Sequence, residues 1–424
     1  MAKRHMNQVG DLESMFLRLE ELVLANSGED EFEEVFKLLI AKLWDERTNA
    51  RQFRVHETEA GTAKAISSLL RQAAKAWSGI IEEPSPRLTP EHLAVCVEAL
   101  AKHTISDASL EVMDGFFEFM VAKGSKGSKG QYFTPRHVVE LCVRMLKPKA
   151  SETMLDPACG SGGFLVHALN FVRSGLSPDQ TAEFCRTNLW GFDIDERAVR
   201  VAKALMILAG DGSANIIRLN SLLQPSMAGL FADDESVLTI EDVCRARMRK
   251  HKGFDIILTN PPFAGEVRER QVLDAYALSA NKLRIERDAL FVERCVQLLR
   301  PGGRMAIVLP HNKFASESFA FLREWIIRKA RVLAVVGLGR NTFLPHTHQK
   351  ASVLFLQKND DITNLDKDYK VFFAISERDG KNSKGQFVLR NGGNGVIWDR
   401  VDHDFSDVAS SFDRFCQKEH LMEV

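Results

Sequence analysis

The sequence predicts an α/β protein, with a doubly wound, mainly parallel sheet of seven strands preceded by a helical domain. From about residue 131, short apolar runs alternate with stretches of helical period, which is typical of βαβ units. Before that point apolar residues recur at helical spacing, and no strand pattern stands out. The chain of 424 residues is long enough for two or three domains with substantial cores.

The helical domain is predicted over residues 1–122. Its clearest amphipathic face has apolar residues at spacings of three and four, which are Phe32, Val35, Phe36, Leu39, Ile40 and Leu43. Further helices are expected around 62–78, 90–103 and 108–121. Residues 123–130 (Lys-Gly-Ser-Lys-Gly-Ser-Lys-Gly) are predicted to be a flexible basic linker. This linker either only connects two domains or brings its lysines to phosphates.

The sheet domain is predicted over residues 131–360. The candidate strands are 153–155, 189–192, 215–218, 254–258, 305–309, 332–338 and 352–356. Helices fit between them, for example at 163–173, 196–209 and 288–299. Residues 361–424 are more polar, and we expect a C-terminal extension with a hairpin and a helix that contacts a partner.

Composition excludes several classes of protein. Apolar content of 45%, charged content of 27% and a net charge of -1 are ordinary for a globular protein, so any nucleic-acid surface must be local. No apolar run approaches the roughly 20 residues of a membrane span, and no signal core follows the N-terminus. The seven cysteines form no Cys-x-x-Cys pair, so we expect no metal site and a cytoplasmic location.

A polar turn follows the apolar run 254–259. Its residues are Asn260, Pro261, Pro262 and Phe263, and the prolines must end the strand because they cannot donate to a sheet ladder. In open α/β sheets, ligands bind at the carboxyl ends of the strands. An amide oxygen beside an aromatic ring suits a flipped-out base held by its amino group. The alternative is a strand-ending turn with a core phenylalanine.

A glycine-rich turn links the first strand of the sheet to a helix. Its candidate ligand-binding residues are Asp156, Ala158, Gly160, Ser161, Gly162 and Gly163. Glycines let a backbone approach a ligand closely, and the next helix offers its first amides. No Lys-Ser/Thr pair follows, so the turn is not a P-loop. A purely structural turn is the alternative.

The second and third strands each end in a polar residue. Asp193, followed by Ile194, stands where an acid typically accepts ribose hydroxyls. Asp195 could instead cap the next helix. Asn220 ends the third strand, where its amide could pair with an adenine edge or serve as an ordinary turn residue.

In this order and spacing, the glycine turn, Asp193 and the Asn-Pro-Pro-Phe turn resemble the amino-methyltransferases that use S-adenosylmethionine. The preceding Gly-Gln-Tyr-Phe-Thr-Pro-Arg at 130–136 narrows the resemblance to the N6-adenine DNA methylase family, especially modification subunits of type I restriction systems. The resemblance implies a Rossmann-like fold, S-adenosylmethionine as cofactor and double-stranded DNA as substrate. It also implies a partner specificity subunit, and a restriction subunit as a further partner.

The resemblance carries roles to residues of this chain. The segment that would hold the methionine end of the cofactor comprises Gln131, Tyr132, Phe133, Thr134, Pro135 and Arg136, with Thr134 at the carboxylate. The glycine turn would wrap the methionine moiety, and Asp193 would bind the ribose. Asn220 stands where many relatives carry an aspartate that faces the adenine.

The catalytic turn would act on adenine N6, a poor nucleophile because its lone pair is conjugated into the ring. Asn260 Oδ1 and the Pro261 carbonyl would accept its two hydrogens and free the lone pair, while Phe263 stacks on the base. The loop with Phe343 could supply a second stacking surface; its His346 and His348 have no partner cluster for a metal. Basic residues in 245–252 and 264–287 could touch phosphates or be solvated faces.

Two other functions remain open at this point. The same turn could methylate RNA or protein glutamine, although Phe263 and the segment 131–135 favour DNA. A degenerate methylase could instead serve as a DNA-binding or assembly subunit, against which the glycine turn, Asp193 and Asn260 argue.

Overall fold

The computed structural model describes residues 4–5, 9–105, 110–124, 133–210, 215–224, 239–247, 253–359, 368–390 and 400–421. Contacts divide the chain into two compact units. The first comprises Met1–Ser128 together with Glu196–Ala214, and the second comprises Lys129–Asp195 together with Asn215–Val424. Most of the predicted linker, and Gln131 and Tyr132, lie outside the described residues.

The first unit is helical. Its helices are α1 (Val9–Ser27), α2 (Glu31–Thr48), α3 (Glu59–Ala76), α4 (Pro90–Ala101), α5 (Leu110–Gly124) and α9 (Glu196–Ala209). Side chains of Asp30, Thr58 and Thr89 cap α2, α3 and α4 by accepting an amide of the first turn. Two short strands, β1 (Arg4–His5) and β2 (His103–Thr104), pair in parallel, a feature that the sequence pattern did not predict.

Helix α9 is held in this unit by two arginine contacts. The Arg200 side chain is buried; its Nη1 lies 2.8 Å from Glu33 Oε1, and its Nε donates to the Ile80 carbonyl at 3.0 Å. Arg47 Nη1 donates to the Ile207 carbonyl at 2.5 Å. The first unit is therefore built from two stretches that lie far apart in the sequence.

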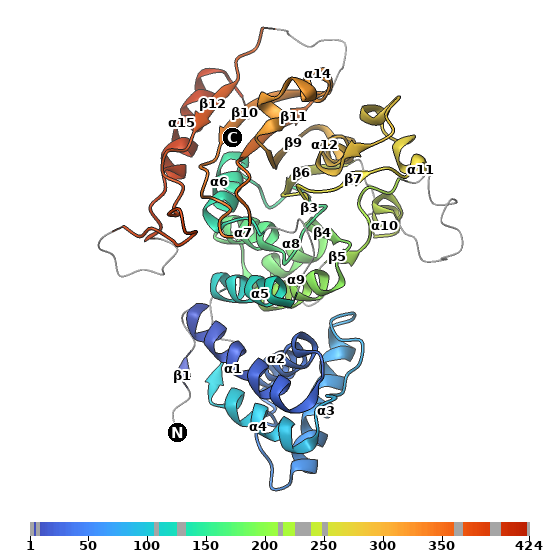
Figure 1. Ribbon diagram of the computed structural model, residues 1–424, viewed down its shortest axis with the longest axis vertical. Helices are drawn as coiled ribbons and strands as arrows, with labels where there is room; N and C mark the ends of the chain where they lie inside the picture. The colour runs from blue at the N-terminus through green and yellow to red at the C-terminus, as the bar shows by residue number, and fades with distance from the viewer. Residues whose placement is uncertain are drawn as a thin grey trace. The chain divides into compact units, whose positions relative to one another are not determined.

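The second unit contains an eight-stranded sheet (Figure 1). Its order is β12-β10-β11-β9-β6-β3-β4-β5. The strands are β3 (Met154–Asp156), β4 (Leu189–Asp193), β5 (Asn215–Arg218), β6 (Phe254–Thr259), β9 (Leu299–Pro310), β10 (Ala330–Gly337), β11 (Ala351–Lys358) and β12 (Phe372–Ile375). Only β11 runs antiparallel to its neighbours in this sheet, so the sheet is mainly parallel.

All seven predicted strands are present, but the predicted number was wrong by one. The added strand is β12, at the edge of the sheet beside β10. It pairs over four residues only, and Phe373 and Ile375 point outward with 72% and 73% of their surface exposed. Residues 371–375 (Val-Phe-Phe-Ala-Ile) form an apolar run like those of the other strands, but the run lies in the more polar segment that was assigned to the C-terminal extension.

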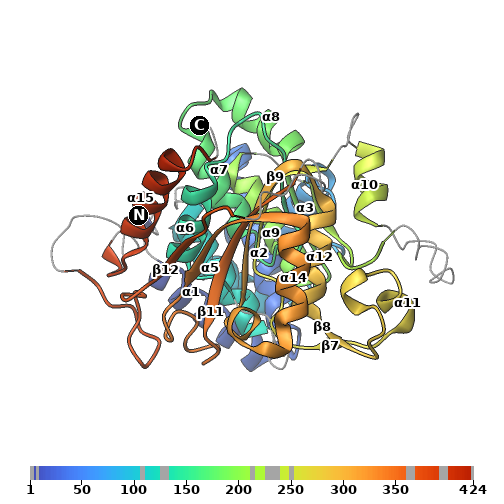
Figure 2. The ribbon, with the colours of Figure 1, turned by 90° about the horizontal axis from the view of Figure 1, so that it is seen from above.

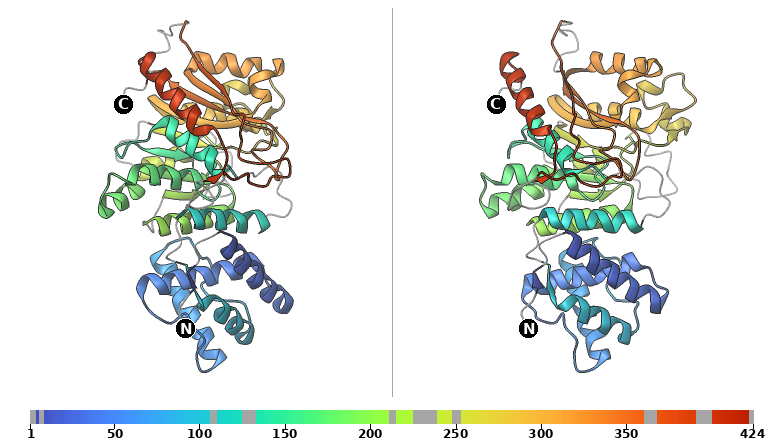
Figure 3. Two further views of the ribbon diagram at one scale, coloured as in Figure 1. Left: turned by 90° about the vertical axis from the view of Figure 1, so that its left-hand side faces the viewer. Right: turned by 60° about the vertical axis from the view of Figure 1, so that its left-hand side comes forward.

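Helices cover both faces of the sheet, as a doubly wound fold requires. Figure 2 shows α12 (Arg287–Leu298) and α14 (Ala320–Lys329) on one side and α6 (Arg136–Leu146) and α15 (Phe405–Lys418) on the other. Helix α15 lies in the segment where a terminal helix was expected, and it packs beside α6 and against β12 (Figure 3). Within the described part of residues 361–424, the antiparallel pairing where the hairpin was expected consists of isolated bridges, one of which joins Lys381 to Phe387.

The remaining elements complete the second unit. They are α7 (Gly163–Arg173), α8 (Pro178–Asn188), α10 (Ile240–Arg247), β7 (Glu266–Val267), α11 (Arg270–Leu273), η2 (Ala277–Ser279), β8 (Ile285–Glu286), α13 (Asn312–Ala315) and η3 (Glu317–Phe319). Strands β7 and β8 pair as an antiparallel ladder after the Asn-Pro-Pro-Phe turn. Of the helices that the structure describes, none has the length and apolar character needed to cross a membrane.

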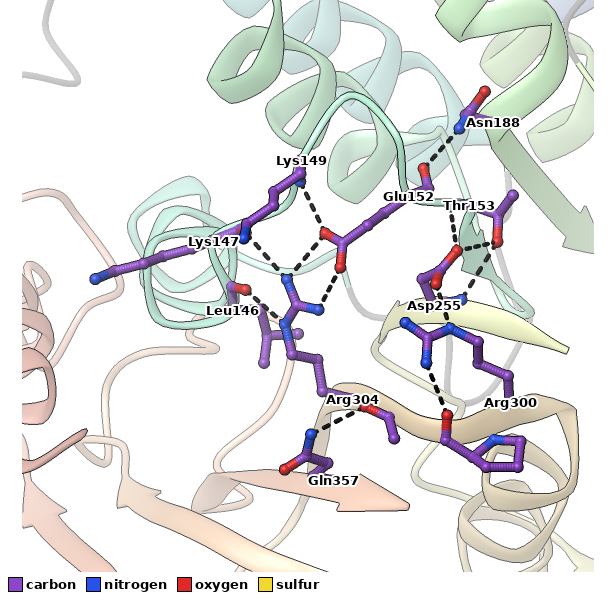
Figure 4. A network of polar contacts seen from close by, with 12 residues as sticks. Leu146, Lys147, Lys149, Glu152, Thr153, Asn188, Asp255, Arg300, Arg304 and Gln357 are labelled. Carbon is purple, nitrogen blue, oxygen red and sulfur yellow. Dashed lines mark hydrogen bonds and ion pairs between the residues drawn. The ribbon is translucent and has the colours of Figure 1, made fainter. Parts of the chain in front are cut away.

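A polar network ties together the amino ends of β3, β6 and β9 (Figure 4). The Arg304 guanidinium contacts both oxygens of Glu152, at 2.5 and 2.9 Å, and donates to the carbonyls of Leu146 and Lys147. Bidentate pairing of this kind is among the stronger charge-assisted contacts. The network closes this edge of the sheet and places the end of α6 there.

Candidate active site

The candidate site lies at the carboxyl ends of β3, β4, β5 and β6. The chain builds β3, β4 and β5 outward in one direction and then returns to place β6 on the other side of β3. The crevice at such a reversal of strand order is where open α/β sheets bind ligands. Asp156 ends β3 and Thr259 ends β6, so Asn260 begins its turn directly beside this reversal.

The glycine turn leaves β3 and enters α7 through two left-handed glycines. Gly160 has φ of +52° and Gly162 has φ of +93°, conformations that side chains with a Cβ rarely adopt. A Cβ built on Gly160 would meet no protein atom within 4 Å. Packing within the described protein therefore leaves open space at Gly160.

Asp193 fastens this turn to the end of β4. Its Oδ2 accepts the Gly160 amide at 2.9 Å, and its Oδ1 accepts the Asp195 amide at 2.9 Å. Burial raises the pKa of the Asp193 carboxyl, while these amide donors oppose the rise. Ile194, beside it, is 62% exposed, which leaves an apolar surface next to the carboxylate.

The end of β5 joins the same edge. Asn220 Oδ1 accepts the Leu222 amide at 3.1 Å, so the side chain shapes its own turn. The Ser221 hydroxyl donates to the Pro157 carbonyl at 2.5 Å. This bond connects the β5 turn to the glycine turn, a link that the sequence did not indicate.

The Asn-Pro-Pro-Phe turn is half-buried to buried. Asn260 is partly accessible, Pro261 is buried, and Phe263 is only 7% exposed. The Phe263 ring lies edge-on to the Phe343 ring, with centroids 5.7 Å apart and an interplanar angle of 69°. The structure thus places Phe343, from the loop after β10, against the proposed catalytic turn.

The segment that precedes α6 reaches the same edge. The last residues of α6 lie at the amino ends of the strands, where their carbonyls accept from Arg304. Because α6 packs along β6 and β9, its first residue, Arg136, lies toward the carboxyl ends. Phe133 and Thr134 are half-buried there, and Pro135 and Arg136 are buried.

Asp156 is a second buried carboxyl at this edge, and its pKa is also raised. It is 1% exposed, and burial raises its pKa to about 7. The Asp193 carboxylate adds to this rise, whereas Thr259 and the Ala158 amide, which donates to Asp156 Oδ1 at 3.0 Å, oppose it. Asp156 therefore stabilises the turn by accepting the Ala158 amide, and near neutral pH its carboxyl lies close to its own pKa.

Some contacts of the site escaped sequence reasoning. Thr259 is fully buried next to Asp156 and immediately precedes Asn260, so its position was a usable signal. The C-terminal contacts to the Phe343 loop, described below, carried no signal in the sequence. No group of three or more potential metal-ligating side chains occurs within the described ranges.

Comparison with solved structures identifies the fold of the protein. The fold is that of the S-adenosylmethionine-dependent methyltransferases. A Streptococcus thermophilus structure, the methyltransferase subunit of a type I restriction-modification system, matches with a TM-score of 0.63 and 16% identity, over 96% of this chain and 94% of that chain. At this identity the likeness shows the fold alone.

The family follows from the sequence. The model of the family described as N-6 DNA Methylase matches residues 108–424, and the chain belongs to this family. The type II restriction enzyme and methyltransferase RM.BcgI of Heyndrickxia coagulans is 25% identical over 263 residues, which are 60% of this chain and 36% of that protein. The type I EcoEI methylase subunit of Escherichia coli is 27% identical over 55% of this chain and 44% of that protein. The chain thus matches less than half the length of either relative.

Proposed function

We propose that this protein transfers a methyl group from S-adenosylmethionine to N6 of an adenine flipped out of double-stranded DNA. The observation that carries the proposal is the convergence of the glycine turn, Asp193 and Asn260 at one reversal point of the sheet. Membership of the N-6 DNA methylase family supports the same reaction.

The residues present fit the cofactor. The open space at Gly160 admits a ligand against the backbone, and Gly162 at the N-cap of α7 has no side chain to cover the first amides of that helix. Asp193 would accept the ribose hydroxyls, with Ile194 against the adenine ring. Phe133, Thr134, Pro135 and Arg136, with Gln131 and Tyr132 before them, would hold the methionine end. When bound, S-adenosylmethionine supplies an activated methyl group on its sulfonium.

The turn at Asn260 would prepare the nucleophile. Asn260 Oδ1 and the Pro261 carbonyl would accept the two N6 hydrogens and draw the nitrogen toward tetrahedral geometry. Positioning and oriented dipoles then provide the catalysis, and no ionised base is needed for the attack. The largely covered Phe263 ring implies that its surroundings rearrange before a base stacks on it.

We further propose that the chain acts as a modification subunit with a specificity subunit that selects the sequence. The named relatives include type I methylase subunits, which supports this assignment. The segment between β7 and β8 exposes Arg268, Arg270 and Arg284, which would contact phosphates. Phosphate contacts position DNA without reading its sequence, so these arginines would leave sequence recognition to other groups, which we assign to the specificity subunit.

The proposal is tested by presenting the protein, with and without its genomic neighbour, with several acceptors. Labelled S-adenosylmethionine is incubated with duplex DNA, RNA and a protein extract, and the products are identified by mass spectrometry. We expect N6-methyladenine in DNA and no label in the other acceptors. Label in RNA or on protein glutamine would show that the site acts on that substrate and would contradict the proposed DNA reaction. Failure to bind S-adenosylmethionine at all would favour a degenerate subunit.

A further inference from the structure

The C-terminal extension contacts the loop that presents Phe343 to Phe263. Residues 376–387, which we term the C-terminal clamp, follow β12 directly. Strand β12 runs parallel to β10, so the clamp and the loop 339–345 leave the sheet at the same edge. This is also the edge of the proposed catalytic turn.

Asp379 is the central contact of the clamp. It is 8% exposed, and its Oδ2 accepts the backbone amide of Asn341 at 2.9 Å. Its other oxygen, Oδ1, accepts the Lys381 amide at 3.3 Å. A Cβ on Gly339 would collide with the Asp379 carboxylate, so the two segments approach each other as closely as a glycine permits.

Two further groups fasten the loop on either side of Phe343. Lys381 Nζ donates to the Leu344 carbonyl at 2.7 Å, and Asn341 Nδ2 donates to the Lys381 carbonyl at 3.3 Å. Gly385, with φ of +79°, would place a Cβ only 2.7 Å from Pro345 N. The loop is thereby held through its backbone at Asn341 and Leu344, which flank the aromatic residue.

The clamp is itself anchored next to the cofactor segment. A Cβ on Gly380 would lie 3.5 Å from the His137 ring, and that ring stacks on His403 and Phe405 with centroids 5.4 Å away in each case. His137 follows Arg136, the last residue of the proposed cofactor segment. The extension thus spans from the start of α6 to the Phe343 loop.

We propose that Asp379 and Lys381 are positioning residues of the target-base site, which hold Phe343 and through it the Phe263 ring. The proposal rests on the proposed function for its kinetic part and on geometry alone for its structural part. It assigns to the C-terminal extension a role inside the catalytic domain, in addition to the partner contact expected of it.

The test compares Asp379→Ala, Asp379→Asn and Lys381→Met with the control Asp402→Asn in the full chain. Asp402 pairs with Arg378, which precedes Asp379 in the clamp, and with Arg390, but among the described contacts it has none with the loop 339–345, so it controls for a change of charge at the clamp. Hydrogen exchange is measured by mass spectrometry for peptides that cover 338–347. We expect at least tenfold faster exchange there in Asp379→Ala, less in Asp379→Asn, and no change in the glycine-turn peptides or in the control.

The kinetic arm uses duplex DNA and saturating S-adenosylmethionine. We expect kcat for methyl transfer to fall tenfold to a hundredfold in Asp379→Ala and Lys381→Met, because misplacement by about 1 Å can cost that much. The Kd for S-adenosylmethionine should change less than twofold, and Lys381→Arg should restore most of the rate.

Unchanged exchange in 338–347 overturns the clamp. Faster exchange with an unchanged kcat overturns its role in the target-base site, as does a parallel loss of cofactor affinity. If the unmodified protein fails to methylate DNA, the proposed function and this kinetic role fall together, while the exchange result still decides whether the clamp holds the loop.

Discussion

At the scale of single residues, the site is a set of polar groups that hold one another by short contacts. Asp193 shows this most clearly, because one carboxylate accepts amides from the glycine turn and from its own chain. Each oxygen of a carboxylate can accept a second hydrogen bond, so the same group can still receive ribose hydroxyls. The structural role of this residue and its proposed ligand-binding role are therefore compatible.

We predict that Asp193→Asn weakens cofactor binding at least tenfold, because an amide offers one acceptor oxygen where the carboxylate offers two. Isothermal titration with S-adenosylmethionine measures the change. The exposed Asp179, in the first turn of α8, provides the control Asp179→Asn. An unchanged Kd for Asp193→Asn would remove this residue from the site.

Asp156 makes a prediction about pH. Its folded pKa, about 7, lies above the ordinary value of 3.8, so the folded state binds a proton more tightly than the unfolded state. Stability from this group is therefore lost as pH rises from about 4 to 7, and the difference corresponds to roughly 4 kcal/mol at most.

Asp156→Asn should remove this loss. We expect the difference in thermal midpoint, variant minus natural protein, to be more positive at pH 8 than at pH 5. Scanning fluorimetry at both pH values measures the two differences. Parallel pH curves for the two proteins would show that Asp156 is ionised with an ordinary pKa.

At the scale of elements, the two opposite edges of the sheet differ: the edge at the amino ends of the strands is closed, and the edge at their carboxyl ends is open. Arg304, Glu152 and their neighbours close the amino ends of the strands, whereas glycines and prolines shape the carboxyl ends. The glycine turn is the part of this edge whose conformation a ligand would explain best.

Gly160→Ala tests that explanation. Alanine at φ of +52° costs about 1–2 kcal/mol of strain, yet its Cβ meets no protein atom. We expect a small loss of thermal stability and at least a tenfold loss of cofactor affinity. Gly28→Ala is the matched control, since Gly28 has φ of +68° and equally open space but lies between α1 and α2. Equal effects of both variants on cofactor binding would contradict a ligand at Gly160.

The elements also show how far sequence reasoning reaches. Buried parallel strands such as β6 are mostly apolar runs, which can be recognised in the sequence. The Asn-Pro-Pro-Phe turn marks where β6 ends. Strand β12 also lies in an apolar run, residues 371–375, but this run is short and stands in an otherwise polar segment, and the sequence does not show that Phe373 and Ile375 are exposed at the edge of the sheet. The Asp379 contact joins the weakly patterned C-terminal extension to Asn341, 38 positions earlier in the loop after β10. Only the folded chain brings these two residues together.

At the scale of the whole molecule, the two compact units are interleaved in sequence. Helix α9 follows β4 directly, yet its contacts group it with the N-terminal helices. The alternation of helices and strands predicted α9 correctly. It could not indicate that α9 groups with the N-terminal helices, because the contact between Arg200 and Glu33 joins residues 167 positions apart. The first unit therefore depends on a segment that begins just after the proposed ribose-binding acid.

We predict that Arg200→Met destabilises this unit by about 2–3 kcal/mol. The value is below the roughly 3–5 kcal/mol for a fully buried pair, because the Glu33 side chain stays 28% exposed. Lys102→Met is the control, since its pair with Glu98 is exposed and worth at most about 1 kcal/mol. Hydrogen exchange in α2 and α5 reports the change, and equal exchange in the two variants would refute the role of Arg200.

The most direct test of the proposed reaction compares the natural protein with Asn260→Ala, each with its genomic neighbour. Nucleoside mass spectrometry measures N6-methyladenine in duplex DNA, and titration measures S-adenosylmethionine binding. We predict that the variant loses at least a hundredfold in methyl transfer, by the magnitude of a lost oriented dipole, while its cofactor Kd changes less than threefold. Undiminished methylation by Asn260→Ala, or loss of cofactor binding in step with activity, would contradict the account.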